Sequence, residues 1–397
     1  MDKEDKEQYT KLYDPSEFTP LDPTQELIFP PELWSLEQKP QRQLRFKGER
    51  VLWIQPSSLP ELLELKGQYP TAKLVVGNTE VGIEMKFKNL LYPVILAPAL
   101  IPELNIVQHT ENGIVFGAAC TLTLLGDVLR DGVRDLPSNQ TEIFQAVLEQ
   151  LHWFAGQQIR NVAAVGGNIM TASPISDLNP VFMAAGCKLT LLSKGGKRVV
   201  EMDDKFFAGY RRTAMKPDEI LLSIEIPYTR KGQYFSAFKQ SPRREDDIAI
   251  VTCGMNVVFE EDTNTVKDLR LSYGGMAPTT VLAKNTSNQL IGRTWSEELM
   301  QEACSLLAEE MTLDPSAPGG LVLYRCTLTI SLFFKFYLTV QHKLAKDLKA
   351  EGIPMEDLRP DYASAVQLFH KETPSSIQIY QRLCPQGRAK SMWWGVP

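Results

Sequence analysis

Leu74-Val75-Val76-Gly77-Asn78-Thr79-Glu80-Val81 is the stretch that decides the fold of this chain. Its first three residues are apolar and include two β-branched valines, a composition that predicts a buried strand. Gly and Asn tolerate positive φ, so the chain can turn sharply after the strand. Successive N–H groups in such a turn can form an anion-binding nest. A plain strand-to-turn transition is the alternative interpretation.

A second stretch of small residues runs from Asn161 to Asn168 and continues into Ser173–Pro180. Ala164, Gly166 and Gly167 would let a diphosphate approach the main chain closely, because they add little or no side chain. Asn168 and Asp177 could then orient the polar atoms of a cofactor. A tightly packed turn with Asx caps is the alternative.

Hydrophobic periodicity from about residue 45 predicts short strands that alternate with helices. In the first part we expect strands at 51–54, 73–76, 94–96, 114–116, 188–192, 198–202 and 220–226, and helices at 59–68 and at 142–154 after Thr141 as N-cap. After the charged stretch 243–247 we expect strands at 248–259 and 266–273, then helices at 296–310 and 324–344. This order predicts a mixed, α+β fold.

The same patterns divide the chain into four parts. Residues 1–45 are rich in proline and are expected to form a connector. Residues 46–231 and 240–345 are expected to form two domains, and 346–397 a linker with an atypical tail at 382–397.

Composition excludes several classes of function. The 397 residues carry a net charge of −6, which argues against nucleic acid or an anionic membrane as the main partner. The six cysteines are scattered and contain no CxxC, so we expect no metal or iron–sulfur site. The N-terminus has no apolar signal core, and the apolar run 326–340 is too short to span a bilayer. We therefore expect a cytoplasmic protein.

Familiar catalytic motifs are missing from the sequence. It contains no GxGxxG, no phosphate-binding GK[ST] loop, no GxSxG and no HExxH. The four histidines, at 109, 152, 342 and 370, are far apart and are expected to be surface or helix residues. Asp246-Asp247 could be a catalytic pair, or could belong to a solvated, charged hinge.

Five segments resemble the flavin domain of the molybdenum hydroxylases. They are 23–33 (PTQELIFPPEL), 73–89 (KLVVGNTEVGIEMKFKN), 153–184 (WFAGQQIRNVAAVGGNIMTASPISDLNPVFMA), 235–251 (FSAFKQSPRREDDIAIV) and 331–340 (SLFFKFYLTV). The similarity extends from about residue 10 to about residue 380. SPISDLNPVFMA and RREDDIA resemble the purine-oxidising branch more than the aldehyde-oxidising branch.

The resemblance implies a fold and a set of cofactor contacts. The fold is a FAD-binding domain of the vanillyl-alcohol-oxidase (p-cresol methylhydroxylase) type, followed by a C-terminal α+β subdomain. FAD would be bound non-covalently. Its contacts would be Leu74, Val75, Val76, Gly77, Asn78, Thr79, Glu80, Val81, Phe154, Ala164, Gly166, Gly167, Asn168, Asp177, Leu221 and Lys239. Ala164 departs from the family, which usually has Ser there.

The resemblance also implies electron transfer from FAD to NAD⁺. Glu80, Tyr210, Asp246 and Asp247 match family positions near the flavin and the nicotinamide, and are the candidate catalytic residues. The iron–sulfur clusters and the molybdopterin belong to other domains of the intact family enzyme. We therefore expect this chain alone not to oxidise a purine.

Three alternatives stay open at this point. The chain could be a non-catalytic fragment that acts through interactions, a flavin module of the aldehyde-oxidising branch, or an independent flavin oxidase. The sequence leaves the oligomeric state undetermined.

Overall fold

The computed structural model describes residues 16, 24, 42–243, 246–356 and 362. The chain divides into two compact units, 1–42 and 43–397, and the helices and strands named in the following paragraphs belong to the second. The connector expected at 1–45 and the tail expected at 382–397 lie almost entirely outside the described residues.

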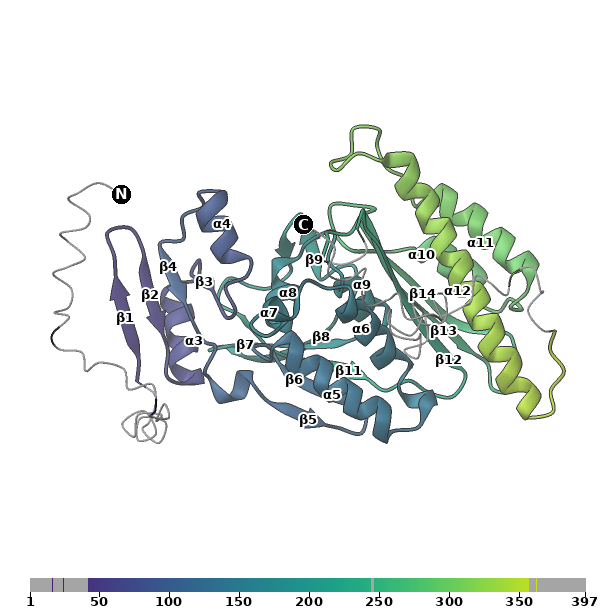
Figure 1. Cartoon of the computed structure of the whole chain (residues 1–397), viewed down its shortest axis with the longest axis horizontal. Coiled ribbons are helices and arrows are strands. Elements are labelled where there is room, and N and C mark those ends of the chain that lie inside the picture. The colour runs from purple at the N-terminus through teal and green to yellow at the C-terminus, as the bar shows by residue number, and fades with distance from the viewer. Residues whose placement is uncertain (1–15, 17–23, 25–41, 244–245, 357–361, 363–397) are drawn as a thin grey trace. The chain divides into compact units, whose positions relative to one another are not determined.

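The first sheet of the described chain has the strand order β1-β2-β4-β3 (Figure 1). Its strands are β1 (Leu44–Lys47), β2 (Leu52–Gln55), β3 (Lys73–Leu74) and β4 (Val94–Leu96). The pairings β2–β4 and β3–β4 are parallel, so helical crossovers must connect these strands. The crossovers contain α3 (Leu59–Gln68) and α4 (Val81–Phe87). Ser58 starts α3, because its side chain accepts a hydrogen bond from the Glu61 N–H.

The second sheet is antiparallel throughout, with the order β5-β6-β11-β7-β8. Its strands are β5 (Val107–His109), β6 (Gly113–Gly117), β7 (Lys188–Ser193), β8 (Gly196–Glu201) and β11 (Ile220–Pro227). Between β6 and β7 the chain forms α5 (Leu122–Asp135), α6 (Glu142–His152), α7 (Gln157–Arg160), α8 (Val165–Thr171) and α9 (Asn179–Ala184). A short ribbon of β9 (Phe207–Gly209) and β10 (Arg212–Thr213) precedes β11.

The third sheet has the order β12-β13-β14-β15 and is antiparallel. Its strands are β12 (Gln233–Gln240), β13 (Val251–Phe259), β14 (Val266–Gly274) and β15 (Val281–Leu282). They are followed by α10 (Lys284–Leu290), α11 (Glu297–Glu310) and α12 (Val322–Ala350). One hydrophobic cluster joins this sheet to these helices, with Trp295 packed against Phe333, Phe336 and Tyr337.

Most expected elements are present, and the α+β class is confirmed. The helix at 59–68 and the hairpin β7–β8 lie where the sequence predicts them. Two details of α6 differ from the prediction. The helix ends at His152 rather than Phe154, and the Thr141 side chain makes no capping bond. Thr229 caps the helix in its place, because the Thr229 hydroxyl accepts a hydrogen bond from the Glu142 N–H at 3.1 Å.

Several elements were not expected from the sequence, among them α4, α5, α9 and β12, and the strand expected at 73–76 ends at Leu74. The stretch read as a loop at 161–168 contains the start of α8, although glycine disfavours a helix interior. Tertiary bonds compensate, because the Val165 and Gly166 N–H groups donate to the Cys120 and Ala118 carbonyls at 3.0 Å each. The third sheet begins at β12, before the charged stretch after which the second domain was expected to start.

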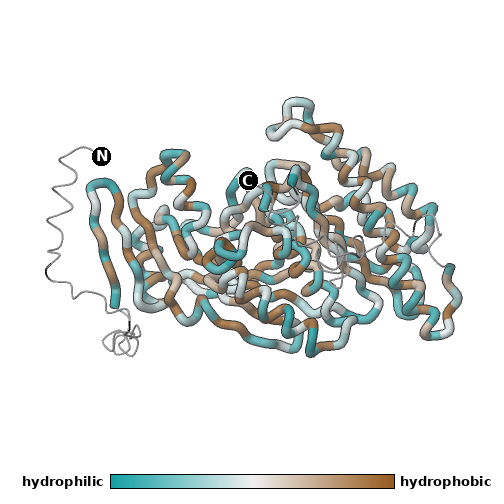
Figure 2. Tube along the Cα trace, in the orientation of Figure 1, coloured by the Kyte–Doolittle hydropathy of each residue, from teal (hydrophilic) through white to brown (hydrophobic). Residues whose placement is uncertain are grey.

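Hydrophobic residues are spread over the helices and strands rather than gathered in one segment (Figure 2). The buried ones form one large cluster that includes residues of the first two sheets, and a second cluster that includes residues of the third sheet. No helix in the described part of the chain combines the length and apolar character needed to cross a membrane.

Candidate functional site

A cavity of about 850 Å³ brings together residues that are far apart in the sequence. Its volume lies within the usual range for ligand pockets. Sixteen residues were predicted as cofactor contacts, and most of them line it: Leu74, Val75, Val76, Gly77, Asn78, Thr79, Glu80, Val81, Phe154, Ala164, Gly167, Asn168 and Asp177. Glu80, Asp246 and Asp247, three of the four candidate catalytic residues, line it as well.

The turn between β3 and α4 forms one wall, and two residues give it its shape. Asn78 has φ +57°, the left-handed conformation that Asn tolerates. Gly77 lies against the backbone of residue 162, because a Cβ at Gly77 would meet the Val162 carbonyl oxygen at 1.9 Å. Glycine is therefore needed at 77 for this close approach, and Asn78 supplies the positive φ.

The main chain of this turn offers hydrogen-bond donors. The Val75 N–H bonds the Leu96 carbonyl, and the Gly82 N–H bonds the Asn78 carbonyl. Between them, the N–H groups of residues 76–81 have no acceptor among the described residues. A row of unpaired N–H groups on a cavity wall suits an anion, so the turn fits the diphosphate of a dinucleotide such as FAD.

The opposite wall includes the start of α8, where the two glycines have different surroundings. Gly167 lines the cavity, and the nearest atom to a Cβ there is the Ala164 Cβ at 3.9 Å. At Gly166 a Cβ would meet the Ala118 carbonyl oxygen at 2.5 Å, and Gly166 is not among the lining residues. That Gly167 admits a diphosphate stays a prediction, made for a residue that lines the cavity, whereas Gly166 packs tightly against residue 118.

Asn168 is already engaged by its own loop. Its amide nitrogen donates to Asn179 Oδ1 at 3.0 Å, and its amide oxygen accepts from the Ser176 hydroxyl at 3.1 Å. The Ser176 hydroxyl in turn accepts a hydrogen bond from the Asn179 N–H at 3.1 Å. Asn168 therefore organises the 173–179 segment and keeps one N–H for a ligand.

Asp177 and Lys239 form a buried ion pair at the cavity wall. Lys239 Nζ lies 3.1 Å from the Asp177 carboxylate and donates to the Trp153 carbonyl at 2.9 Å. Burial raises the pKa of Asp177 to about 6, and Lys239 opposes the shift only in part. Lys239 thus contacts the site through Asp177 and is not itself a lining residue.

A polar cluster that sequence reasoning missed lies beside Glu80. Arg211 Nη1 contacts Glu80 Oε1 at 2.6 Å and Glu84 Oε1 at 3.2 Å. The Tyr92 hydroxyl donates to Glu84 Oε2 at 2.7 Å, and burial together with this bond raises the pKa of Tyr92 to about 12. All four side chains line the cavity. Arg211 follows Tyr210 in the β9–β10 turn, and nothing in that local sequence distinguishes it from a surface arginine.

The rim of the cavity contains Arg243 and residues 246–249. Asp246 has φ +52°. Asp247 closes the loop, since its carboxylate accepts from the Arg243 and Ile248 N–H groups at 2.9 and 2.8 Å. The Arg243 guanidinium and these N–H groups lower the pKa of Asp247. Asp247 thus contacts both Arg243 and Ile248 of the expected charged region, whose members Arg244 and Glu245 lie outside the described residues.

Two further predicted residues do not reach the cavity. Tyr210 is 62% exposed and is not among the lining residues, although its neighbour Arg211 is. Leu221 is buried in β11, within the first hydrophobic cluster. The described residues also contain no group of three or more His, Cys, Asp or Glu placed to hold a metal.

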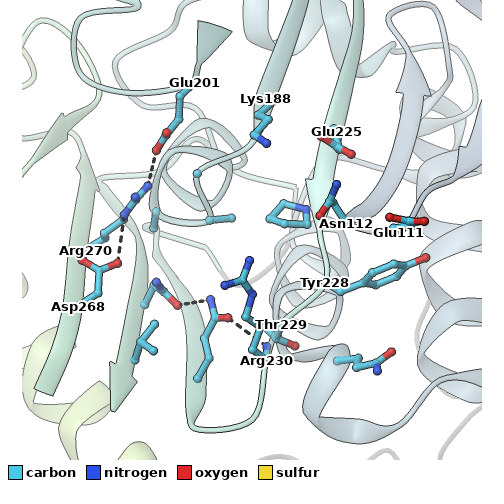
Figure 3. Close-up of a pocket in the computed structure, with 18 residues that line it drawn as sticks. Glu111, Asn112, Lys188, Glu201, Glu225, Tyr228, Thr229, Arg230, Asp268 and Arg270 are labelled. Atoms are coloured by element: carbon cyan, nitrogen blue, oxygen red, sulfur yellow. Dashed lines mark hydrogen bonds and ion pairs between the residues drawn. The ribbon is translucent and has the colours of Figure 1, made fainter. Parts of the chain in front are cut away.

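A second cavity, of about 570 Å³, lies between the second and third sheets. Arg270 stands between Glu201 and Asp268 there, with contacts of 2.6 and 3.5 Å (Figure 3). None of the residues predicted as a functional site lines it. We therefore assign the candidate site to the larger cavity.

Two family descriptions match the chain. Residues 44–229 match "FAD binding domain in molybdopterin dehydrogenase", and residues 236–340 match "CO dehydrogenase flavoprotein C-terminal domain". Xanthine dehydrogenase/oxidase of Gallus gallus is 65% identical over 379 residues, which are 96% of this chain and 28% of that protein. Aldehyde oxidase 1 of Macaca fascicularis is 45% identical, over 95% of this chain and 28% of its own length. The chain thus spans less than a third of these relatives.

Solved structures agree in fold. Carbon monoxide dehydrogenase from Hydrogenophaga pseudoflava superposes with a TM-score of 0.63 at 22% identity, over 72% of this chain and 96% of that chain. At this identity the likeness shows the fold alone. The family matches and the high identity to oxidoreductase relatives establish that this chain belongs to the molybdenum hydroxylase family and corresponds to its FAD-binding flavoprotein portion.

Proposed function

We propose that this chain passes electrons between its FAD and NAD⁺, as part of an enzyme that resembles xanthine dehydrogenase. The supporting observation is that Glu80, Asp246 and Asp247 line the same cavity as the donor-rich 76–81 turn. Acidic side chains beside a flavin favour an approaching, positively charged nicotinamide ring. The cavity thus combines donors for a diphosphate with three carboxylates, of which Glu80 is paired with Arg211 and Asp247 with Arg243.

FAD bound here would supply the hydride chemistry, which needs close stacking of the nicotinamide and flavin rings. The 76–81 turn and Gly167 would hold the diphosphate. Phe154 would contact the ring system, and Asn168 and Asp177 would fix polar atoms of the cofactor. Asp246 at the rim would attract the nicotinamide, and Asp247 would keep that rim in shape through its bonds to Arg243 and Ile248.

In this proposal residues 46–231 and 240–345 act as the two parts of the flavin module, and 1–45 and 346–397 as connecting segments. The intact enzyme would deliver electrons from purine oxidation at molybdenum through iron–sulfur domains, in the cytoplasm. The identity to Gallus gallus xanthine dehydrogenase/oxidase supports a purine rather than an aldehyde as the electron source.

The test is an NADH-to-dye assay on the FAD-loaded chain, with FAD affinity measured on the same preparations. The parent should reduce the dye at the expense of NADH. Asp246→Arg should lower this rate several-fold while changing the FAD Kd much less, because positive charge develops on the nicotinamide ring as NADH gives up its hydride. Glu103→Arg makes the same change of charge at an exposed residue outside the cavity, and should leave both quantities unaltered.

A chain that binds FAD but transfers no electrons from NADH would contradict the proposal and favour the non-catalytic, interacting fragment. Equal effects of Asp246→Arg and Glu103→Arg would remove Asp246 from the site. A parallel loss of rate and FAD affinity in Asp246→Arg alone would indicate that the rim supports the cofactor rather than the nicotinamide.

A further inference from the structure

The segment 173–177 forms part of the cofactor cavity and is held from behind by the third sheet. The Gly275 N–H, just after β14, donates to the Pro174 carbonyl at 2.7 Å. The Thr252 hydroxyl, in β13, donates to the Ser176 carbonyl at 3.0 Å, and Thr252 is fully buried. Two main-chain carbonyls of the cavity wall are thus fixed by the C-terminal part of the chain.

The main chain at Gly274 and Gly275 packs too closely against its neighbours for either position to hold a side chain. A Cβ at Gly274 would lie 2.5 Å from Thr252 Oγ1 and 3.1 Å from the Pro174 carbonyl oxygen. Gly275 has φ +90°, and a Cβ there would meet the Ile250 carbonyl oxygen at 2.3 Å. The peptide that carries the Gly275 N–H therefore has little freedom, and a shift at residue 275 would move Pro174.

Arg325, in the first turn of α12, fixes residue 275 from the other side. Its guanidinium donates to the Gly275 carbonyl at 2.8 Å, the Gly320 carbonyl at 2.9 Å and the Pro318 carbonyl at 3.1 Å. Arg325 is only 7% exposed, and these three acceptors in the described part of the chain are main-chain carbonyls rather than a carboxylate. A planar guanidinium with five N–H donors can bridge three carbonyls, which an ammonium cannot do in the same geometry.

We propose that Arg325 is a positioning residue for the flavin site, which acts through Gly275 and Pro174 on the 173–177 wall. Arg325 is not among the residues that line the cavity, so its effect reaches the cofactor only by this route. The inference rests on the proposal that FAD occupies the cavity. It gives the C-terminal subdomain a part in holding the cofactor, in addition to the direct contact of Lys239 with Asp177.

The test compares FAD release with stability in Arg325→Met, Arg325→Lys and a matched core variant. The matched core variant is Leu307→Ala. It truncates a fully buried side chain of α11, which belongs to the hydrophobic cluster of the third sheet and does not line the cavity. The variants are compared by FAD dissociation rate and visible flavin spectrum, together with the melting temperature of the apo chain. Arg325→Met should speed FAD dissociation on the order of tenfold, the size expected for losing about one charged hydrogen bond from the wall.

Arg325→Lys should show a smaller effect in the same direction, because its ammonium can keep at least one carbonyl. Leu307→Ala should release FAD at the parent rate, even if its melting temperature falls as far as that of Arg325→Met. This difference separates positioning from a general loss of stability. Arg325→Lys also carries the test if Arg325→Met does not fold.

Thr252→Val provides a second, nearly isosteric perturbation of the same wall. It removes the bond to the Ser176 carbonyl without touching Arg325. Because both changes loosen one segment, the double variant should release FAD more slowly than the product of the single effects predicts.

If Arg325→Met releases FAD no faster than Leu307→Ala at equal stability, the inference is overturned. The proposed function would stay intact. Strictly multiplicative effects of Arg325→Met and Thr252→Val would also count against a shared route. A parent chain that binds no FAD would overturn both the inference and the proposed function.

Discussion

Lys239 Nζ lies 3.1 Å from the Asp177 carboxylate, and the lysine side chain is only 2% exposed. The pair joins β12 of the third sheet to the cofactor wall built by the preceding part of the chain. A buried pair of this kind is costly to desolvate, and removing one partner leaves the other charge uncompensated. The pair therefore controls both the stability of the wall and its response to pH.

The pH dependence of stability should contain a term from Asp177. Its folded pKa is raised to about 6, above the value of about 3.9 for an unfolded aspartate. The contribution of Asp177 to the free energy of unfolding is thus fully present below about pH 4, and it is lost as the pH rises through about 6. Between pH 7 and pH 5 the parent apo chain should gain about 1 kcal/mol relative to Asp177→Asn. Urea unfolding of both proteins at the two pH values measures this, and a constant difference would contradict the assignment.

Gly167→Ala should separate cofactor binding from folding. A methyl group at 167 has no neighbour closer than 3.9 Å and would project from the cavity wall. Because alanine favours a helix over glycine by about 1 kcal/mol, the apo chain should melt at the same or a higher temperature. FAD should nevertheless bind more weakly. Titration of the apo chain with FAD and a melting curve provide the two numbers, and unchanged affinity would exclude Gly167 from the diphosphate site.

Gly166→Val should behave differently, although the two glycines are adjacent. Its Cβ would lie 2.5 Å from the Ala118 carbonyl oxygen, so α8 must move away from residue 118. We expect a loss of about 2 kcal/mol or more in stability, with FAD lost as a consequence. Denaturant unfolding of the apo chain checks this. Full stability together with loss of FAD would restore Gly166 as a direct cofactor contact.

Ala164→Ser should strengthen FAD binding. Ala164 lines the cavity, and the resemblance to the flavin domain of the family predicts a Ser at this position. A hydroxyl donor to the cofactor would contribute about 1 kcal/mol, or roughly a fivefold lower Kd. Isothermal titration of the apo proteins with FAD makes the comparison. An unchanged or higher Kd would mean that a main-chain N–H already fills this role.

FAD should be held without a covalent bond. Covalent flavins are attached through His, Cys or Tyr, and Tyr92 is the single such residue among those that line the cavity in the described chain. Its hydroxyl donates to Glu84 at 2.7 Å, and its raised pKa keeps it protonated. Acid precipitation of the loaded protein should leave the yellow colour in the supernatant. Flavin in the washed pellet would contradict this.

The sequence by itself determined the local features. Periodicity predicted the helix at 59–68, the hairpin of β7 and β8 and the strands β13 and β14, because each combines regularly spaced apolar residues with flanking turn residues. The family resemblance of segments such as 73–89 and 153–184 predicted the cofactor site, whereas the residue types alone left a plain turn as the alternative at both stretches. The positive φ of Asn78 is compatible with its residue type, which tolerates the left-handed conformation.

Only the tertiary structure decided which partners these residues have. It showed that Gly166 faces residue 118 and that Gly167 faces the cavity, although the two are equivalent in the sequence. It brought Arg211 to Glu80 across 131 positions, and Lys239 to Asp177 across 62. Such contacts depend on how sheets and loops pack, since long-range partners leave no local periodicity in the chain. For the same reason, the support that Arg325 gives to Gly275 is visible only once the third sheet and α12 are folded together.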